Sequence, residues 1–128
     1  MNAPVLVVED DPDLLALLEM VVADAGHRVR TASNGLEALA RVAEERPGVI
    51  LLDMRMPVMN GWEFARELRA RHGRCCAIVV LTAAENAQQR AAEIGADGWL
   101  AKPFDLDDVL AAIAHHLADR DGGAPAAH

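Results

Sequence analysis

Short apolar runs alternate with stretches of helical periodicity along most of the chain. The runs are four to six residues long, and the stretches between them repeat apolar residues at the i, i+3, i+4 and i+7 positions of an amphipathic helix. The alternation occurs five times, which predicts five βα units and a parallel sheet. The predicted strands are Val5–Val8, His27–Ala32, Val49–Leu52, Ile78–Leu81 and Gly98–Ala101.

Helix signals fill the segments between the strands. The first predicted helix carries Pro12 in its first turn, where proline is tolerated, and the second ends before Pro47, because proline disfavours helical geometry in the preceding residue. A third helix begins at Gly61, and the fifth has Asp105 as its N-cap. The fourth, Glu85–Ile94, is rich in alanine and weakly amphipathic, so we expect it to be the least firmly docked.

The strand order follows from how apolar each strand is. Three strands are almost purely apolar, as is typical of central parallel strands that are covered on both faces. The second strand alternates polar and apolar residues and the last is short, so both belong at sheet edges. We therefore predict an α/β fold, a doubly wound five-stranded parallel sheet of order 2-1-3-4-5 flanked by five helices. The domain is expected over residues 1–118, and residues 119–128 are expected to form a flexible tail or linker stub.

Composition and charge limit the function classes. With 128 residues, 52% of them hydrophobic, the chain has the size and composition of one globular domain. Twenty acidic against twelve basic residues give a net charge of −8, which disfavours direct contact with nucleic acids or anionic membranes. No apolar run approaches a membrane span, and the first residues lack the features of a signal peptide, so we expect a cytoplasmic protein. Cys75 and Cys76 lack partners at zinc-ligand spacing and are predicted to be buried free thiols in a strand.

Acidic residues follow two strands that should be neighbours. Glu9 and Asp10 come after the first strand and Asp53 after the third, so their carboxylates should converge at the carboxyl edge of the sheet. Carboxylates about 5 Å apart repel by roughly 3 kcal/mol per pair at an effective dielectric constant near 20. A divalent cation with oxygen ligands, as Mg²⁺ prefers, would relieve this repulsion. Helix capping is the alternative role for such residues, and it suits Asp11 best.

Two further strand ends add a hydroxyl and an ammonium group. Thr82 ends the fourth strand, and Lys102, the only lysine among twelve basic residues, ends the fifth. A phosphoryl group on Asp53 would therefore meet a metal ion, a hydroxyl and an ammonium, which is the electrostatic environment that phosphoryl transfer requires.

Four motifs lie in order at these strand ends: Val-Val-Glu-Asp-Asp, Leu-Leu-Asp-Met-Arg-Met-Pro-Val-Met-Asn-Gly, Leu-Thr-Ala and Gly-Ala-Asp-Gly-Trp-Leu-Ala-Lys-Pro-Phe. With them, the chain resembles the receiver domain of bacterial two-component response regulators from residue 4 to about 118, and in particular the stand-alone receivers of the chemotaxis-regulator type. The resemblance implies that Asp53 accepts a phosphoryl group from a histidine kinase or a histidine phosphotransfer protein.

The resemblance also implies roles for the neighbouring residues. Asp10, Asp53 and the backbone carbonyl of Arg55 would ligate Mg²⁺, with Glu9 acting through water. Thr82 and Lys102 would hold phosphoryl oxygens, and the Lys102–Pro103 peptide bond would be cis. In the family, the threonine is coupled to an aromatic residue three positions before the lysine, which here is Trp99. An indole is harder to move into a small pocket than the usual tyrosine or phenylalanine ring, so Trp99 is either a switch residue or a fixed docking surface.

The resulting prediction is a phosphorylation switch that signals through protein–protein contacts. Such a protein is not an enzyme in the ordinary sense, because it catalyses only its own phosphoryl transfer and a slow autodephosphorylation. Two alternatives stay within the family: a receiver excised from a larger regulator or hybrid kinase, and a scaffold receiver that is not phosphorylated. An aspartyl phosphatase would need a second acid where Arg55 stands, and a flavin or nucleotide carrier would need a phosphate-binding loop where Glu9 and Asp10 stand.

Overall fold

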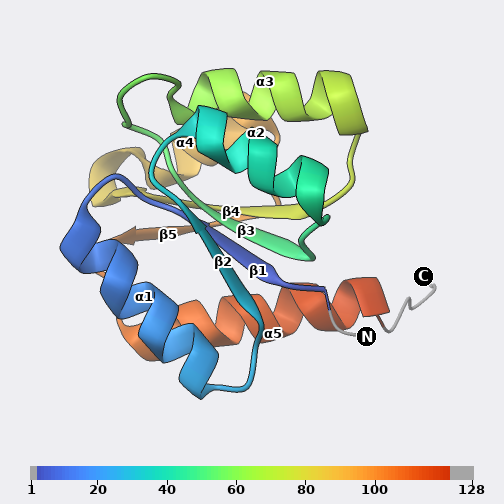
Figure 1. Cartoon of the computed structure of the whole chain (residues 1–128). Helices are drawn as coiled ribbons and strands as arrows, with labels where there is room; N and C mark the ends of the chain where they lie inside the picture. The colour runs from blue at the N-terminus through green and yellow to red at the C-terminus, as the bar shows by residue number, and fades with distance from the viewer. Residues whose placement is uncertain (1–2, 122–128) are drawn as a thin grey trace.

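The computed structural model describes residues 3–121, in which five parallel strands alternate with five α-helices (Figure 1). The strands are β1 (Val5–Val8), β2 (Val29–Ala32), β3 (Val49–Asp53), β4 (Ala77–Ala83) and β5 (Gly98–Lys102). The helices are α1 (Pro12–Asp24), α2 (Gly35–Glu44), α3 (Gly61–His72), α4 (Ala87–Ile94) and α5 (Leu106–Asp121), with a 3₁₀ turn, η1, at Ala84–Asn86. The strand order is β2-β1-β3-β4-β5, which confirms the predicted topology.

The sheet is covered on both faces. Helices α2, α3 and α4 lie on one face, and α1 and α5 lie on the other (Figure 1). Alternate residues of β1 divide between the two cores: Leu6 packs with Phe64 of α3, and Val7 packs with Ile113 of α5. Because each central strand buries side chains on both faces, β1, β3 and most of β4 are apolar at nearly every position. Within residues 3–121, no helix is long and apolar enough to cross a membrane.

Element ends differ from the prediction where backbone hydrogen bonds redirect the chain. The predicted second strand begins at His27, but the His27 N–H donates to the Val22 carbonyl and closes the end of α1, so β2 begins at Val29. The fourth helix begins at Ala87, later than predicted, because η1 precedes it. Helix α5 continues to Asp121, three residues past the predicted domain end, and residues 122–128 of the predicted tail lie outside the described residues.

The prediction for the two cysteines is wrong. They precede β4, which begins only at Ala77, where the backbone N–H bonds to the Gly48 carbonyl. Cys76 is buried and Cys75 half-buried, and the two are joined in a vicinal disulfide with their Cα atoms 3.8 Å apart. Neither is therefore a free thiol.

Val58, in the loop between β3 and α3, has a strained backbone. Its φ is +69°, and the Met59 N–H donates to the Pro57 carbonyl across it at 2.7 Å. A positive φ in an i→i+2 turn is rare, and a β-branched residue disfavours it strongly. The Val58 side chain is 75% exposed, so no core packing compensates for the strain.

Val58→Gly should therefore raise the free energy of unfolding by about 1 kcal/mol, because glycine adopts positive φ without steric conflict. Urea denaturation would measure the change. Val58→Ala is the control, since it removes the exposed methyl groups and keeps the Cβ. An equal gain in both variants would show that the exposed apolar surface, and not the backbone conformation, limits stability.

Candidate functional site

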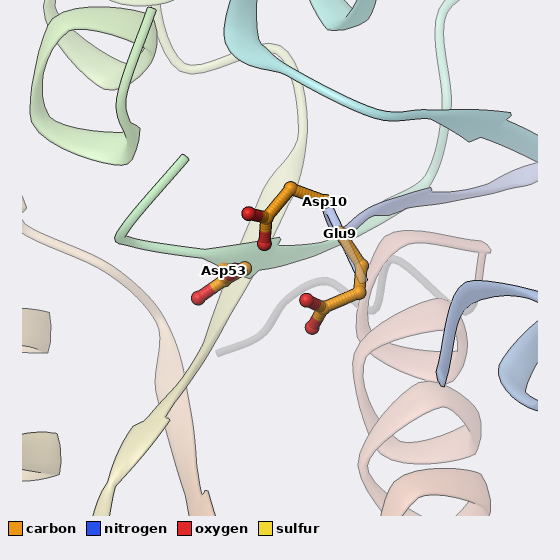
Figure 2. A group of neighbouring side chains, drawn as sticks. All are labelled: Glu9, Asp10 and Asp53. Carbon is orange, nitrogen blue, oxygen red and sulfur yellow. The ribbon is translucent and has the colours of Figure 1, made fainter. Parts of the chain in front are cut away.

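Three carboxylates meet where the strand order reverses, between β1 and β3. Glu9 and Asp10 directly follow β1, and Asp53 is the last residue of β3 (Figure 2). The parallel register pairs Val8 with Leu52, which brings the residues after both strands to the same edge of the sheet. One carboxylate oxygen from each of the three side chains lies within 4.8 Å of the others. The predicted convergence of Glu9, Asp10 and Asp53 is confirmed.

The cluster is buried and short of positive charge. Glu9 is 1% exposed and Asp53 6%, whereas Asp10 is exposed. The Lys102 ammonium lies 3.2 Å from Glu9 Oε1 and 3.8 Å from Asp53 Oδ1. Burial, and then the charge of Glu9, raises the pKa of Asp53 to about 7, although Lys102 opposes the shift. One ammonium therefore balances only part of the charge of three carboxylates.

Local hydrogen bonds hold the acidic loop in place. The Asp11 side chain caps α1 by accepting hydrogen bonds from the backbone N–H groups of Asp13 and Leu14, as predicted for this residue. The Asp11 N–H donates to Glu9 Oε2 at 3.2 Å, which orients the buried carboxylate. Asp10 instead faces Asp53 in the cluster (Figure 2).

A cavity of about 320 Å³ opens over the cluster. Its lining includes six of the seven predicted site residues: Glu9, Asp10, Asp53, Arg55, Thr82 and Lys102. Thr82 is buried at the end of β4, and the Arg55 N–H donates to Asp53 Oδ1 at 3.4 Å. The Lys102–Pro103 peptide bond is cis, as the family resemblance implies.

One predicted residue lies outside this cavity, and one residue that was not predicted lines it. Trp99, the seventh predicted residue, is 46% exposed on β5 and is absent from the lining of this cavity in the described structure. Its role as switch or docking surface stays a prediction. Asn86 lines the cavity but was not predicted. It stands at the N-cap of α4 without a side-chain capping hydrogen bond, and this position just before a helix is the signal that could have identified it.

The donor set suits a hard divalent cation. Carboxylate oxygens are the ligands that Mg²⁺ prefers, and a partly open site leaves positions for water and phosphate oxygens. The unbalanced charge of the cluster and the raised pKa of Asp53 are both features that a bound cation would correct. Glu9, Asp10 and Asp53 therefore fit such an ion.

The fold and the acidic site together define a class: doubly wound α/β proteins whose site lies at the carboxyl ends of the strands. A model of the response regulator receiver domain matches residues 5–114. The transcriptional regulatory protein PrrA of Mycobacterium tuberculosis is 42% identical over 118 residues, which is 91% of this chain and 50% of that protein. The response regulator MprA of Mycobacterium ulcerans is 39% identical over 113 residues, 87% of this chain and 48% of its own length. The chain thus spans about half the length of these curated relatives.

Solved structures agree with these sequence relatives. The chemotaxis response regulator CheY4 of Vibrio cholerae superposes with a TM-score of 0.81 at 35% identity, over 91% of this chain and 99% of that one. A response regulator of Chloroflexus aurantiacus gives a TM-score of 0.83 at 30% identity, over 92% and 99% of the two chains. The chain belongs to the family of response regulator receiver domains.

Proposed function

We propose that Asp53 accepts a phosphoryl group from a phosphohistidine of a histidine kinase or histidine phosphotransfer protein, with Mg²⁺ in the acidic site. The observation that carries this proposal is the juxtaposition of a nearly buried Asp53 with two further carboxylates and one ammonium group. A purely structural cluster would pair its charges, whereas this one is left with excess negative charge beside an open cavity.

Several residues of the cavity have a role in the transfer. An Asp53 carboxylate oxygen attacks phosphorus, the bond from phosphorus to the donor imidazole nitrogen breaks, and its electron pair returns to the ring. Glu9, Asp10 and Asp53 would hold Mg²⁺, which would supply positive charge to the approaching phosphoryl oxygens. Lys102 moves its ammonium from carboxylates to a phosphoryl oxygen, and the Thr82 hydroxyl donates to another. Asn86 has an amide group beside the same space.

The protein acts as a switch and not as an enzyme with a separate substrate. Its chemistry is its own phosphorylation and the slow hydrolysis of the phosphoaspartate. We place this exchange in the cytoplasm and the output in protein–protein contacts, because the net charge of −8 disfavours direct binding to nucleic acids. In a longer protein, the same receiver would instead act on an attached output domain.

Intact-mass spectrometry after incubation with acetyl phosphate tests the proposal. We expect one phosphoryl adduct in the wild type, dependent on Mg²⁺, and none in Asp53→Asn, which keeps the shape of the side chain and removes the nucleophile. Asp107→Asn, an exposed aspartate on α5, is the matched control and should be labelled like the wild type. A wild type that takes up no phosphoryl group would contradict the proposal and favour a scaffold role. Labelling of Asp53→Asn would assign the phosphoacceptor elsewhere.

A further inference from the structure

Trp62, in the first turn of α3, lies between the acidic site and helix α4. It lines a cavity of about 360 Å³ together with Asp10 and Arg55, which also line the Asp53 cavity. It also lines a second cavity, of about 330 Å³, together with Glu93 and Ile94 of α4. The Trp62 side chain therefore lies next to the cavity near Asp53 and also next to the contact between α3 and α4.

Polar contacts join this indole to α4. The Trp62 Nε1–H donates to Glu93 Oε1 at 2.8 Å, and the Arg90 guanidinium lies 5.3 Å from the centroid of the indole ring. Arg90 Nη1 is 3.1 Å from Glu93 Oε2, and the Gln89 amide also donates to this oxygen. The hydrogen bond from Trp62 is the main cause that lowers the pKa of Glu93, so the carboxylate form that makes these contacts is favoured.

Helix α4 packs on β4 and β5, mostly through small side chains. It is eight residues long, and its N-cap residue, Asn86, makes no side-chain capping hydrogen bond. The residues it buries are Ala87 and Ala91, whose small side chains contribute little apolar area. One more contact from α3 reaches its end, where Arg69 Nη2 donates to the Gly95 carbonyl at 3.2 Å. The contacts of Glu93 therefore join α4 to α3, in addition to the packing of α4 on the sheet.

We infer that Trp62, Glu93 and Arg90 form a latch that holds α4 against α3 in the unphosphorylated protein, and that Trp62 links this latch to the state of Asp53. The second part rests on the proposed function. A phosphoryl group adds charge and volume in a cavity whose walls continue to Trp62 through Asp10 and Arg55. If the latch forms only before phosphorylation, a variant that weakens the latch shifts the equilibrium toward the phosphorylated conformation. The shift equals the factor by which the variant destabilises the latched conformation.

Hydrogen exchange of the full chain, without a phosphodonor, tests the latch. Glu93→Gln removes the charge from the Trp62 contact, and Trp62→Phe keeps an aromatic ring without the N–H group. We expect the α4 amides to exchange about five-fold faster in each variant, the factor that one exposed charge-assisted hydrogen bond supplies. The double variant should show less than the product of the two single effects, because both variants weaken the same Trp62–Glu93 hydrogen bond. Glu85→Gln, which removes an exposed charge in η1, is the matched control and should exchange like the wild type.

Equal exchange in Glu93→Gln and Glu85→Gln, or additive effects in the double variant, would overturn the latch. The initial rate of phosphorylation by acetyl phosphate tests its link to Asp53. We expect a rise of about five-fold in Glu93→Gln and none in Glu85→Gln. An unchanged rate beside faster exchange would overturn the link alone. If even the wild type forms no adduct, the proposed function and the link both fail, while the exchange data still decide whether the latch exists.

Discussion

Between pH 5 and pH 8, without divalent cations, the wild type should lose about 2 kcal/mol of stability relative to Asp53→Asn. Burial and Glu9 raise the pKa of Asp53 from 3.8 to about 7, so the native protein holds this proton after the unfolded chain has released it. Because the native state binds more protons in this window, its stability falls as the pH rises, and the loss is complete above the native pKa. The interval from pH 5 to the native pKa of about 7 spans two pH units, which correspond to a loss of just under 3 kcal/mol in the free energy of unfolding. Relaxation of the protein around the buried charge reduces this loss.

Urea denaturation at several pH values, in the presence of a chelator, measures the difference. Asp107→Asn is the control, because this exposed residue lies outside the cluster, and it should keep the pH dependence of the wild type. Adding Mg²⁺ at pH 8 should restore stability to the wild type and have a smaller effect on Asp53→Asn, since a ligand stabilises only the state that binds it. Parallel pH profiles for the wild type and Asp53→Asn would show that Asp53 ionises without the expected penalty.

Gly61→Ala should lower the free energy of unfolding by about 2 kcal/mol and slow phosphorylation at least ten-fold. A Cβ on Gly61 would lie 2.8 Å from Met54 Cα and 3.1 Å from the Asp53 carbonyl oxygen. Because this backbone directly follows the phosphoacceptor, the added methyl group would displace Asp53 itself. Denaturation and the acetyl phosphate assay measure the two effects.

Gly73→Ala, at the other end of α3, is the control that separates a loss of stability from a displacement of Asp53. Gly73 has a φ of +62° and a ψ of −143°, which residues with a Cβ rarely adopt, and open space around its Cβ position, so its substitution should cost about 2 kcal/mol through the backbone alone. We expect its phosphorylation rate to equal that of the wild type. If Gly61→Ala were destabilised but phosphorylated at the normal rate, the close approach to Met54 would have no role in placing Asp53.

The strands and the acidic cluster could be predicted because both depend on local sequence and simple topology. A central parallel strand must be apolar on both faces, so Val5–Val8 and Val49–Leu52 stand out, and the carboxyl ends of such strands share one edge. Glu9, Asp10 and Asp53 therefore followed from position alone. Lys102 could be predicted as a site residue because it ends β5 and is the only lysine in the sequence.

Other features depend on contacts between distant segments. Asn86 lines the cavity because the chain forms a 3₁₀ turn after β4, and an alanine-rich sequence also allows a helix there. The backbone N–H of His27 closes the end of α1, and this hydrogen bond cannot be read from the type of its side chain. The disulfide between Cys75 and Cys76 likewise depends on the local course of the chain before β4, which the two residue types do not specify.

The sheet order, the carboxylate cluster and the family of the chain all follow from the amino-acid sequence, because periodicity and strand-end residues are properties of neighbouring positions. The depth at which Glu9 and Asp53 are buried depends instead on the packing of the whole domain, and this burial is the main cause that raises the pKa of Asp53. The same packing brings Trp62 of α3 to Glu93 of α4, which lies 31 residues later in the chain. Such contacts depend on where side chains meet in space, which local patterns do not specify.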